Sequence, residues 1–264
     1  MALATPISWP AVFLSLGLGL GAAATATRAD PASAETDFAA HAKRAFQEAQ
    51  ARYRSAPGKT AAAWGFAQTC FDLAEFATNK TERASVAERG IAASQQAIAR
   101  ESNSAPGYYY LGMNLGQLAR TKGLGALKLV SQMQTAFARA RDLDEHLDWA
   151  GPDRNLGLLY RDAPSITSVG SRSKAREHLQ RAAELAPQYP ENRLNLIESY
   201  LQWGESNKAQ RELTALQALW PSTRTNFVGE AWAASWADWD PRLQKLQKRI
   251  EAPQKSLGTP RAQR

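Results

Sequence analysis

Like residues recur 34 positions apart in the C-terminal half of this 264-residue chain. The matching pairs are Pro187 with Pro221, Ala175 with Ala209, Leu179 with Leu213, and Leu185 with Leu219. A unit of this length makes one helix pair, which cannot bury its apolar face alone, so neighbouring units must stack. The period therefore predicts an all-α repeat protein.

The last unit, "YPENRLNLIESYLQWGESNKAQRELTALQALWP", shows the repeating positions most clearly. Its key residues are Leu196 and Tyr200 on a first helix, Gly204 in the turn, and Ala209, Leu213, Leu216 and Pro221 on a second helix. This pattern resembles the tetratricopeptide repeat, W-x2-L-G-x2-Y followed by A-x3-F-x2-A and P. The resemblance implies an antiparallel helix-pair solenoid wound into a right-handed superhelix.

The same register extends toward the N-terminus. The preceding unit places Leu156, Gly157 and Tyr160 on its first helix, and Ala175, Leu179, Ala182 and Pro187 on its second. Two earlier units match less closely. We predict repeats over about 61–104, 105–149, 150–189 and 190–223, within a solenoid that spans 35–250.

Some turns inside the repeats are longer than the motif requires. Tyr160 and Ala175 are 15 residues apart, whereas Tyr200 and Ala209 are 9 apart, so about six residues enter the turn "YRDAPSITSVGSRSKA". We expect about nine extra residues in the second unit, including "TKGLGALKL", and an enlarged connection "TNKTERAS" in the first. Equivalent turns stack on one side of a solenoid. The enlarged loops either form a recognition surface or only steady the first helices.

Both ends of the solenoid are expected to carry extra helices. The segment 37–54 is interpreted as an N-terminal cap or half unit. Near the other end, Trp232, Trp236 and Trp239 fall at i, i+4 and i+7, on one face of a helix over 228–250. We interpret this helix as the cap that closes the last repeat, with a ligand-facing or interface patch as the alternative.

Residues 1–29 have the shape of a secretory signal. An apolar stretch near residues 11–21 precedes small residues with A-x-A sites, and cleavage is expected somewhere in 26–34. This predicts export to the periplasm with no stable membrane span afterwards, and the alternative is a retained N-terminal membrane anchor. The single cysteine, Cys70, excludes an internal disulfide and lies in an apolar helix, where we expect it to be buried.

The positive charge of the chain is concentrated at its C-terminus. The formal net charge is +7, of which residues 1–29 contribute +1 and residues 241–264 contribute +6, so 30–240 is neutral (7 − 1 − 6 = 0). We interpret 251–264 as a solvated, disordered basic tail. No nucleic-acid partner is expected, and weak attraction of the tail to anionic lipid or cell-wall polymer stays open.

The sequence lacks the common signatures of catalysis. It contains no Gly-rich phosphate loop, no G-x-S-x-G and no H-E-x-x-H. Of the three histidines, His178 is expected to face solvent, and His146 lies in the acidic segment "DLDEHLD", which fits a solvated helix end as well as a cation site. We therefore predict no enzyme activity, no cofactor and no metal.

A narrower resemblance covers mainly Ala105–Pro221. There, "LGLLYRDAP", the inserted Gly/Ser loop and "KAREHLQRAAELAPQYPENRLNLIESYL" are similar to exported bacterial tetratricopeptide proteins related to the T component of tripartite ATP-independent periplasmic (TRAP) transporters. That family implies an all-α periplasmic protein, sometimes a homo-oligomer, with a groove or pore for small apolar or organic-acid ligands. A weaker resemblance is to microtubule-associated tetratricopeptide-like proteins.

The repeat register also assigns a concave binding face, because first helices line that face in the tetratricopeptide family. The assigned residues are Tyr109, Met113, Gln117, Arg154, Leu158, Arg161, Asp162, Leu194 and Glu198. The two arginines either hold a carboxylate of a ligand or pair with Asp153, Asp162 or Glu198. Two functions follow: a non-enzymatic scaffold that binds a protein or peptide through this face or the inserted loops, or a small-ligand binding component of a TRAP-type uptake system.

Overall fold

The structure is a computed structural model that describes residues 31–123 and 125–251, with side chains from Phe38 onward. The segment interpreted as a signal and residues 252–264 of the tail lie outside the described residues. None of the residues in the two described ranges forms a β-strand. No helix in this part of the chain is long and apolar enough to cross a membrane.

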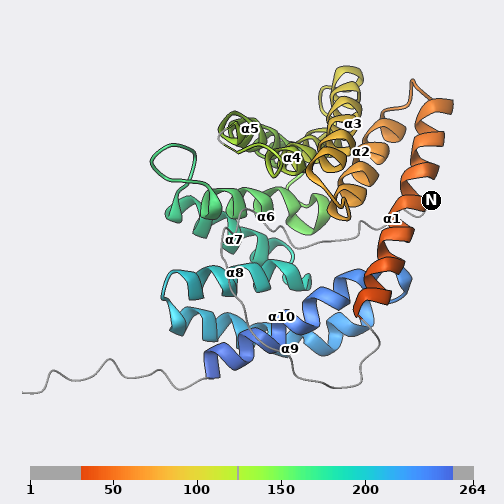
Figure 1. Ribbon diagram of the computed structural model, residues 1–264. Coiled ribbons are helices and arrows are strands. Elements are labelled where there is room, and N and C mark those ends of the chain that lie inside the picture. Colours follow the sequence, from red (N-terminus) through yellow and green to blue (C-terminus); the bar gives the residue numbers. More distant parts are fainter. Residues whose placement is uncertain (1–30, 124, 252–264) are drawn as a thin grey trace, which may run out of the picture.

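The helices follow one another as stacked antiparallel pairs (Figure 1). Helix α1 (Pro31–Ser55) packs on the first pair, and the four pairs are α2 (Thr60–Glu75) with α3 (Lys80–Arg100), α4 (Ala105–Ala119) with α5 (Ala126–Leu143), α6 (Leu147–Asp162) with α7 (Arg172–Leu185), and α8 (Pro190–Gln202) with α9 (Ser206–Asn226). A 3-10 turn (Glu230–Trp232) leads into α10 (Ala233–Glu251), which packs on α8 and α9. The predicted helix-pair solenoid is confirmed.

Small residues allow the helices of a pair to approach closely. A Cβ atom on Gly112 would lie 2.5 Å from the ring of Phe137, and one on Gly157 would lie 2.6 Å from Leu179. Three helices, α3, α4 and α7, begin with a side-chain cap; in α4, Ser104 accepts a hydrogen bond from the Gly107 amide, at 3.3 Å. The repeat positions of the sequence therefore mark the contacts between the two helices of each unit.

Aromatic side chains close the C-terminal end of the core. Trp239 is 0% exposed and Trp232 is 5% exposed. Both rings contact Tyr189 and Phe227, and Trp236 packs edge-on against Trp220. Three large rings at the end of a solenoid bury roughly 150–250 Å² each. The capping role of α10 is confirmed, but the helix begins at Ala233 and not at 228, so Trp236 and Trp239 lie on it while Trp232 precedes it in the 3-10 turn.

The lengths of the intra-repeat connections correct two expectations. The α6–α7 connection, 163–171, is enlarged as predicted, and the α4–α5 connection spans 120–125. However, "ALKL" at 126–129 belongs to α5, so the second insertion is shorter than expected. The expected loop "TNKTERAS" is wrong, because Asn79 caps a helix that begins at Lys80. The extra residues there lengthen α3.

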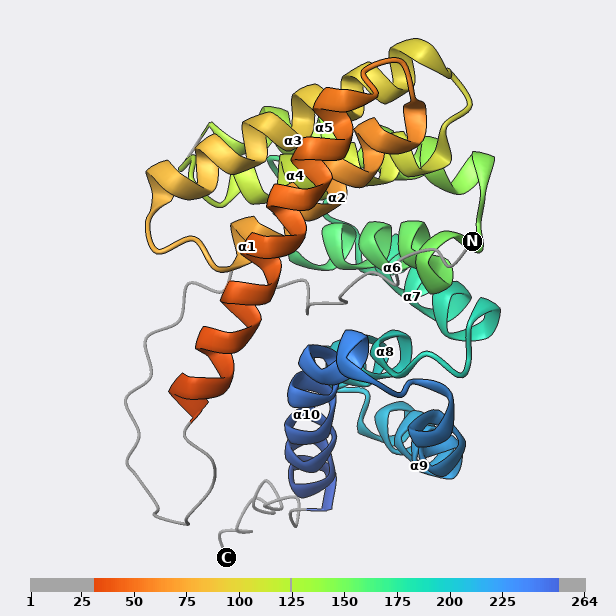
Figure 2. The same cartoon turned by 90° about the vertical axis from the view of Figure 1, so that its right-hand side faces the viewer.

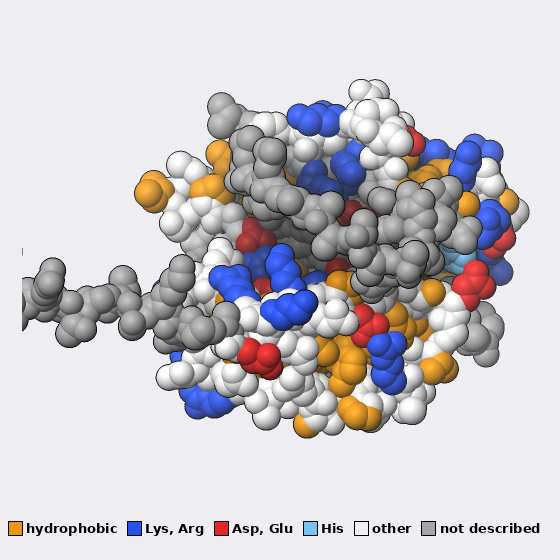
Figure 3. Space-filling view, turned by 60° about the horizontal axis from the view of Figure 1, so that its bottom comes forward, with side chains coloured by type: hydrophobic (Ala, Val, Ile, Leu, Met, Phe, Trp, Pro, Cys, Tyr) orange, Lys and Arg blue, Asp and Glu red, His pale blue; other side chains and the backbone are white. Residues whose placement is uncertain are grey.

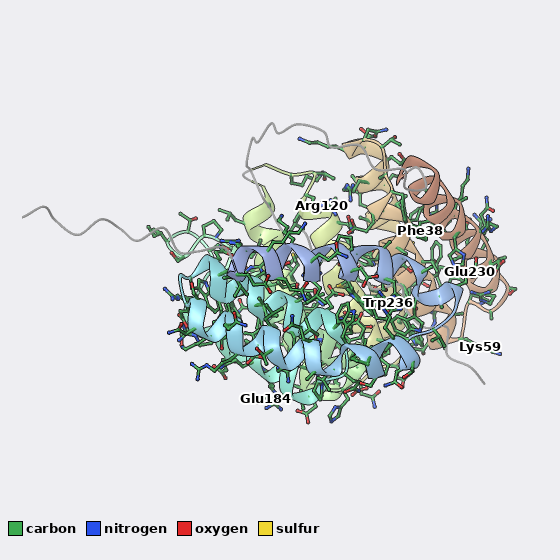
Figure 4. The ribbon with its side chains drawn as sticks, turned by 90° about the horizontal axis from the view of Figure 1, so that it is seen from below. Phe38, Lys59, Arg120, Glu184, Glu230 and Trp236 are labelled. Carbon is green, nitrogen blue, oxygen red and sulfur yellow. The ribbon has the colours of Figure 1, made fainter. Side chains whose placement is uncertain are left out.

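Helix α1 approaches the segment before α10 on one side of the stack. His41 on α1 lies 3.9 Å from the Glu230 carboxylate, measured from Nδ1 to Oε1, just before α10. In Figure 2, α1 and α10 both lie in front of the stacked pairs. Seen from below, α10 crosses the molecule, with Phe38 and Glu230 near one of its ends (Figure 4). The first helices thus have additional helices beside them at both ends.

Candidate functional site

The predicted concave-face residues divide into a buried and a half-buried group. Tyr109, Gln117, Arg154, Leu158 and Leu194 are all at most 4% exposed, whereas Met113, Arg161, Asp162 and Glu198 are half-buried. First helices also pack on one another, as α4 does on α6 and α6 on α8, which leaves each only a narrow free stripe. Leu158 and Leu194 pack in the C-terminal core cluster, so a partner can reach them only if the helices separate. A ligand-binding role for the set stays a prediction.

Tyr109 and Arg154, from the buried group, meet around Asp148. The Tyr109 hydroxyl donates to Oδ2 of Asp148 at 2.5 Å, and Nη2 of Arg154 donates to the same oxygen at 2.6 Å. Asn155 and Asn192 complete this cluster through bonds to Tyr109 and Arg154. Burial opposes the charge of Arg154, but the oxygens of Tyr109 and Asp148 raise its pKa above the ordinary value. The cluster is therefore a buried ion pair whose hydrogen-bonded neighbours connect α4, α6 and α8.

The cluster holds an unusual turn at the start of α6. Asp148, Trp149 and Ala150 have φ angles of 50°, 56° and 62°, in the left-handed region. Such a conformation costs about 1–2 kcal/mol per residue for side chains larger than glycine. Arg154 donates to the carbonyl oxygens of Asp148 and Trp149, and Asn192 also donates to that of Trp149. The buried polar network therefore stabilises the strained turn.

A second polar group lies between α2, α3 and α4. Nη1 of Arg120 donates to both carboxylate oxygens of Glu75, at 3.0 and 2.9 Å. Gln117 also donates to Glu75 and accepts a hydrogen bond from Arg83 at 2.7 Å. Burial and the neighbouring Arg120 lower the pKa of Arg83. Arg120 thus binds Glu75 directly and Arg83 is linked to it through Gln117, with the acid Asp72 nearby.

Two further ion pairs involve the first helices of the third and fourth helix pairs, α6 and α8. Arg161 binds both oxygens of Asp162, at 2.6 and 2.8 Å, and also donates to Ser199 on α8. Glu198 accepts two hydrogen bonds from Arg242 of α10, each of 3.0 Å. Arg161 thus makes one of the pairings considered from the sequence, whereas Arg154 pairs with Asp148 instead.

We call the pairs Glu75–Arg120, Arg161–Asp162 and Glu198–Arg242 the charged ladder. Their side chains are between 12% and 35% exposed, and the formal charges sum to zero, three arginines against three acids. Charged side chains of both signs also lie beside one another on the face shown in Figure 3. The ladder provides charges of both signs that sum to zero.

Two buried acids lie among these groups. Burial raises the pKa of Glu191 to about 7, although Arg154 and Arg242 oppose the shift. Burial, with the nearby carboxylates of Asp148 and Glu75, raises the pKa of Asp72 well above its ordinary value. Both acids thus favour the protonated form more than an exposed carboxyl would.

The expectation that His178 faces solvent is wrong. Its side chain is 9% exposed, and Nδ1 lies 2.7 Å from Oδ1 of the fully buried Asp153. The ring also stacks on Tyr160, with centroids 5.4 Å apart. His178 is therefore a core residue with a hydrogen-bond partner.

Within the described residues, no group of three or more His, Cys, Asp or Glu side chains is arranged to hold a metal ion. Cys70 is buried as predicted, and burial raises the pKa of its thiol to about 12.

The fold has counterparts among solved structures. It matches TTC0263, a thermophilic TPR protein of Thermus thermophilus, with a TM-score of 0.59 and 18% identity over 83% of this chain and 97% of that one. The chain has a tetratricopeptide-like fold. A second match, the MamA protein, has a TM-score of 0.47 and 14% identity over 75% of this chain and 96% of that one. No protein-family model matches the sequence, and no curated protein matches it either.

These comparisons support the tetratricopeptide resemblance and leave the narrower one without support. The narrower resemblance is the one to TRAP T components. Sequence reasoning also missed Asp148, Glu75, Arg120 and Arg242 as members of the polar groups. Glu75 and Arg120 lie at the C-terminal ends of α2 and α4, in equivalent places of two tetratricopeptide units. Because equivalent positions of neighbouring units lie side by side, the repeat register could have predicted this pair.

Proposed function

We propose that this tetratricopeptide-like protein is a non-enzymatic scaffold that binds a protein or peptide partner along the charged ladder. The observation that carries the proposal is the series of partly exposed, mixed-charge pairs along the first helices, the last of them completed by Arg242 of α10. A partner segment with alternating charges can exchange ion pairs with the ladder, and such complementarity selects partners and register. The absence of catalytic motifs from the sequence supports a binding role.

A charge swap within one rung tests this proposal. In Arg161→Asp/Asp162→Arg the two half-buried charges stay paired, but the order of charges that a partner meets is reversed. The matched control is the swap Glu48→Arg/Arg52→Glu on the exposed outer side of α1, where the pair is 67–71% exposed. The mature protein and both variants are used to capture cross-linked partners from a periplasmic extract, followed by mass spectrometry.

We expect the ladder swap to lose at least one protein that the parent and the control swap both retain. Identical partner sets for the parent and the ladder swap would refute binding along the ladder. Circular dichroism spectra and melting temperatures establish that all three proteins are folded to the same extent.

We propose the periplasm as the location, on the basis of the signal-like residues 1–29. A reporter that is active only outside the cytoplasm, fused after residue 264, tests export, and N-terminal sequencing of the secreted form locates cleavage within 26–34. Reporter activity confined to the membrane fraction with an intact N-terminus would instead establish the retained anchor.

A further inference from the structure

The two enlarged connections lie at either side of a pocket. The pocket has a volume of about 320 Å³ and lies between the α4–α5 connection, α5, and the end of α6 with its following loop. Its lining includes Ala119, Val130, Met133, Leu159 and Ala163, which are apolar. Ligand sites in proteins have volumes of roughly 300–1,000 Å³, so this pocket suits a compact molecule.

Exposed apolar side chains lie beside the pocket. Among the described residues, three large hydrophobic side chains are exposed: Leu127, Ile166 and Val228. Leu127 lines the pocket. Ile166 lies in the sequence between Pro164 and Thr167, and both of these residues line the pocket. Scattered apolar residues on a surface need no explanation, but two that flank an apolar pocket extend its contact area.

Arg120 and the start of α5 form the polar end of the pocket. Arg120 uses Nη1 for Glu75 and Gln117, while its Nε and Nη2 atoms bond to no described residue. Helix α5 begins at the pocket without a side-chain cap on Gly125 and without an acid in its first turn. The free N–H groups of a helix start attract anions.

The carboxylates at this end are already neutralised. Both oxygens of Asp162 are bound by Arg161, and both oxygens of Glu75 are bound by Arg120. Of the two charged side chains that line the pocket, Asp162 is thus held by Arg161, which leaves Arg120 as the lining charge that a ligand meets, and the walls behind it are apolar.

We propose that the pocket binds a small monocarboxylate with a short apolar tail. The tail fills the space lined by Val130, Met133 and Leu159. The carboxylate accepts hydrogen bonds from Arg120 and from the first amides of α5. The pocket shares Arg120 and Asp162 with the charged ladder, but it takes a small molecule in place of a protein segment, so its occupancy does not depend on partner binding.

Isothermal titration with three ligands of equal chain length tests the chemistry of the site. Octanoate, 1-octanol and octylamine share the apolar tail and differ in the head group. We expect octanoate to bind at least tenfold more tightly than octanol, and octylamine to bind more weakly than octanol. Equal affinity for octanoate and octanol, or no binding of octanoate, would overturn the proposal.

Substitutions at Gly125 locate the site without disturbing any ion pair. The φ of Gly125 is −66°, and a Cβ atom there meets no atom closer than 3.8 Å, so side chains are tolerated. Gly125→Asp places a negative charge at the start of α5, and Gly125→Asn is its neutral match. We expect the Asp variant to lose octanoate binding at least tenfold relative to the Asn variant, with octanol binding unchanged.

A pocket-filling substitution provides the second location test. Ala163→Leu, at the half-buried end of α6, is expected to weaken octanoate and octanol alike, while Arg211→Gln on the exposed side of α9 changes neither. Octanoate binding that survives both Gly125→Asp and Ala163→Leu would place the ligand elsewhere and refute the assignment. Melting curves without ligand show that each variant is folded.

Discussion

Replacing Arg154 by methionine removes the cation that neutralises Asp148 inside the protein. Arg154 is 4% exposed and makes five hydrogen bonds, to Asp148, Trp149, Asn192 and Tyr109. Without it, Asp148 is left as a buried carboxylate, and its Oδ1 atom already has no partner. Breaking a buried ion pair from one side costs about 3–5 kcal/mol.

The loss of the two carbonyl contacts places the expected cost at the upper end of this range. Those contacts hold the left-handed residues Asp148 and Trp149, whose conformation already costs energy. The free energy of unfolding of a typical domain is about 5–15 kcal/mol, so this one substitution removes a large share of the stability. With an m-value of about 3 kcal/mol/M in urea, the unfolding midpoint is expected to fall by about 1–2 M.

Urea denaturation followed by circular dichroism measures this change. The double variant Arg154→Met/Asp148→Asn is the decisive companion, because asparagine keeps the shape and tolerates positive φ while it removes the charge. We expect it to recover a substantial part of the lost stability. Arg52→Met, which breaks an exposed pair on α1, should have a far smaller effect. If Arg154→Met costs less than about 1 kcal/mol, or the double variant is no better, the buried pair does not support the turn.

Three further predictions concern single residues. Ala150→Gly should leave stability unchanged or raise it by up to about 1 kcal/mol, because φ is 62° there, whereas Ala97→Gly within α3 should cost about 1 kcal/mol or more, as measured by urea unfolding. Gly157→Ala should destabilise the protein by about 1–3 kcal/mol, because its Cβ would lie 2.6 Å from Leu179 and 3.0 Å from its backbone nitrogen. For Glu191, the pKa is raised from 4.5 to about 7 in the folded state, so the native protein holds the proton more tightly and stability falls as pH rises from about 4.5 to 7. Glu191→Gln should flatten that slope in unfolding curves recorded at several pH values, and an unchanged slope would contradict the assignment.

The fold was predictable because the residues that pack helix pairs recur at a fixed spacing. Ala175, Leu179 and their counterparts 34 residues later are all 0–1% exposed. A misjudged connection such as "TNKTERAS" does not alter this register, since extra residues can lengthen a helix as easily as a loop. Asn79 and Glu82 form a cap there that the repeat pattern does not contain.

The candidate site was less predictable because exposure depends on how successive first helices pack. Leu158 and Arg161 are three residues apart on α6, yet Leu158 is 1% exposed and Arg161 is half-buried beside its partner Asp162. The register alone does not state which side of α6 meets α8. The left-handed turn at Asp148 is also invisible in the sequence, since neither glycine nor asparagine marks it.

The α6–α7 loop bears on the question of whether the inserted residues recognise something or only steady the helices. Its base is closed: the Ser171 amide donates to the Tyr160 carbonyl at 2.8 Å, and the Gly170 amide donates to the Pro164 carbonyl at 3.3 Å. Gly170 also lies so close to Ala163 that no side chain fits there. Val169 packs inward against the core cluster, as expected of a loop that steadies the helices, whereas Ile166 is 96% exposed at the tip. The loop therefore combines a packed base with an exposed apolar tip, and a role of that tip in recognition stays a prediction.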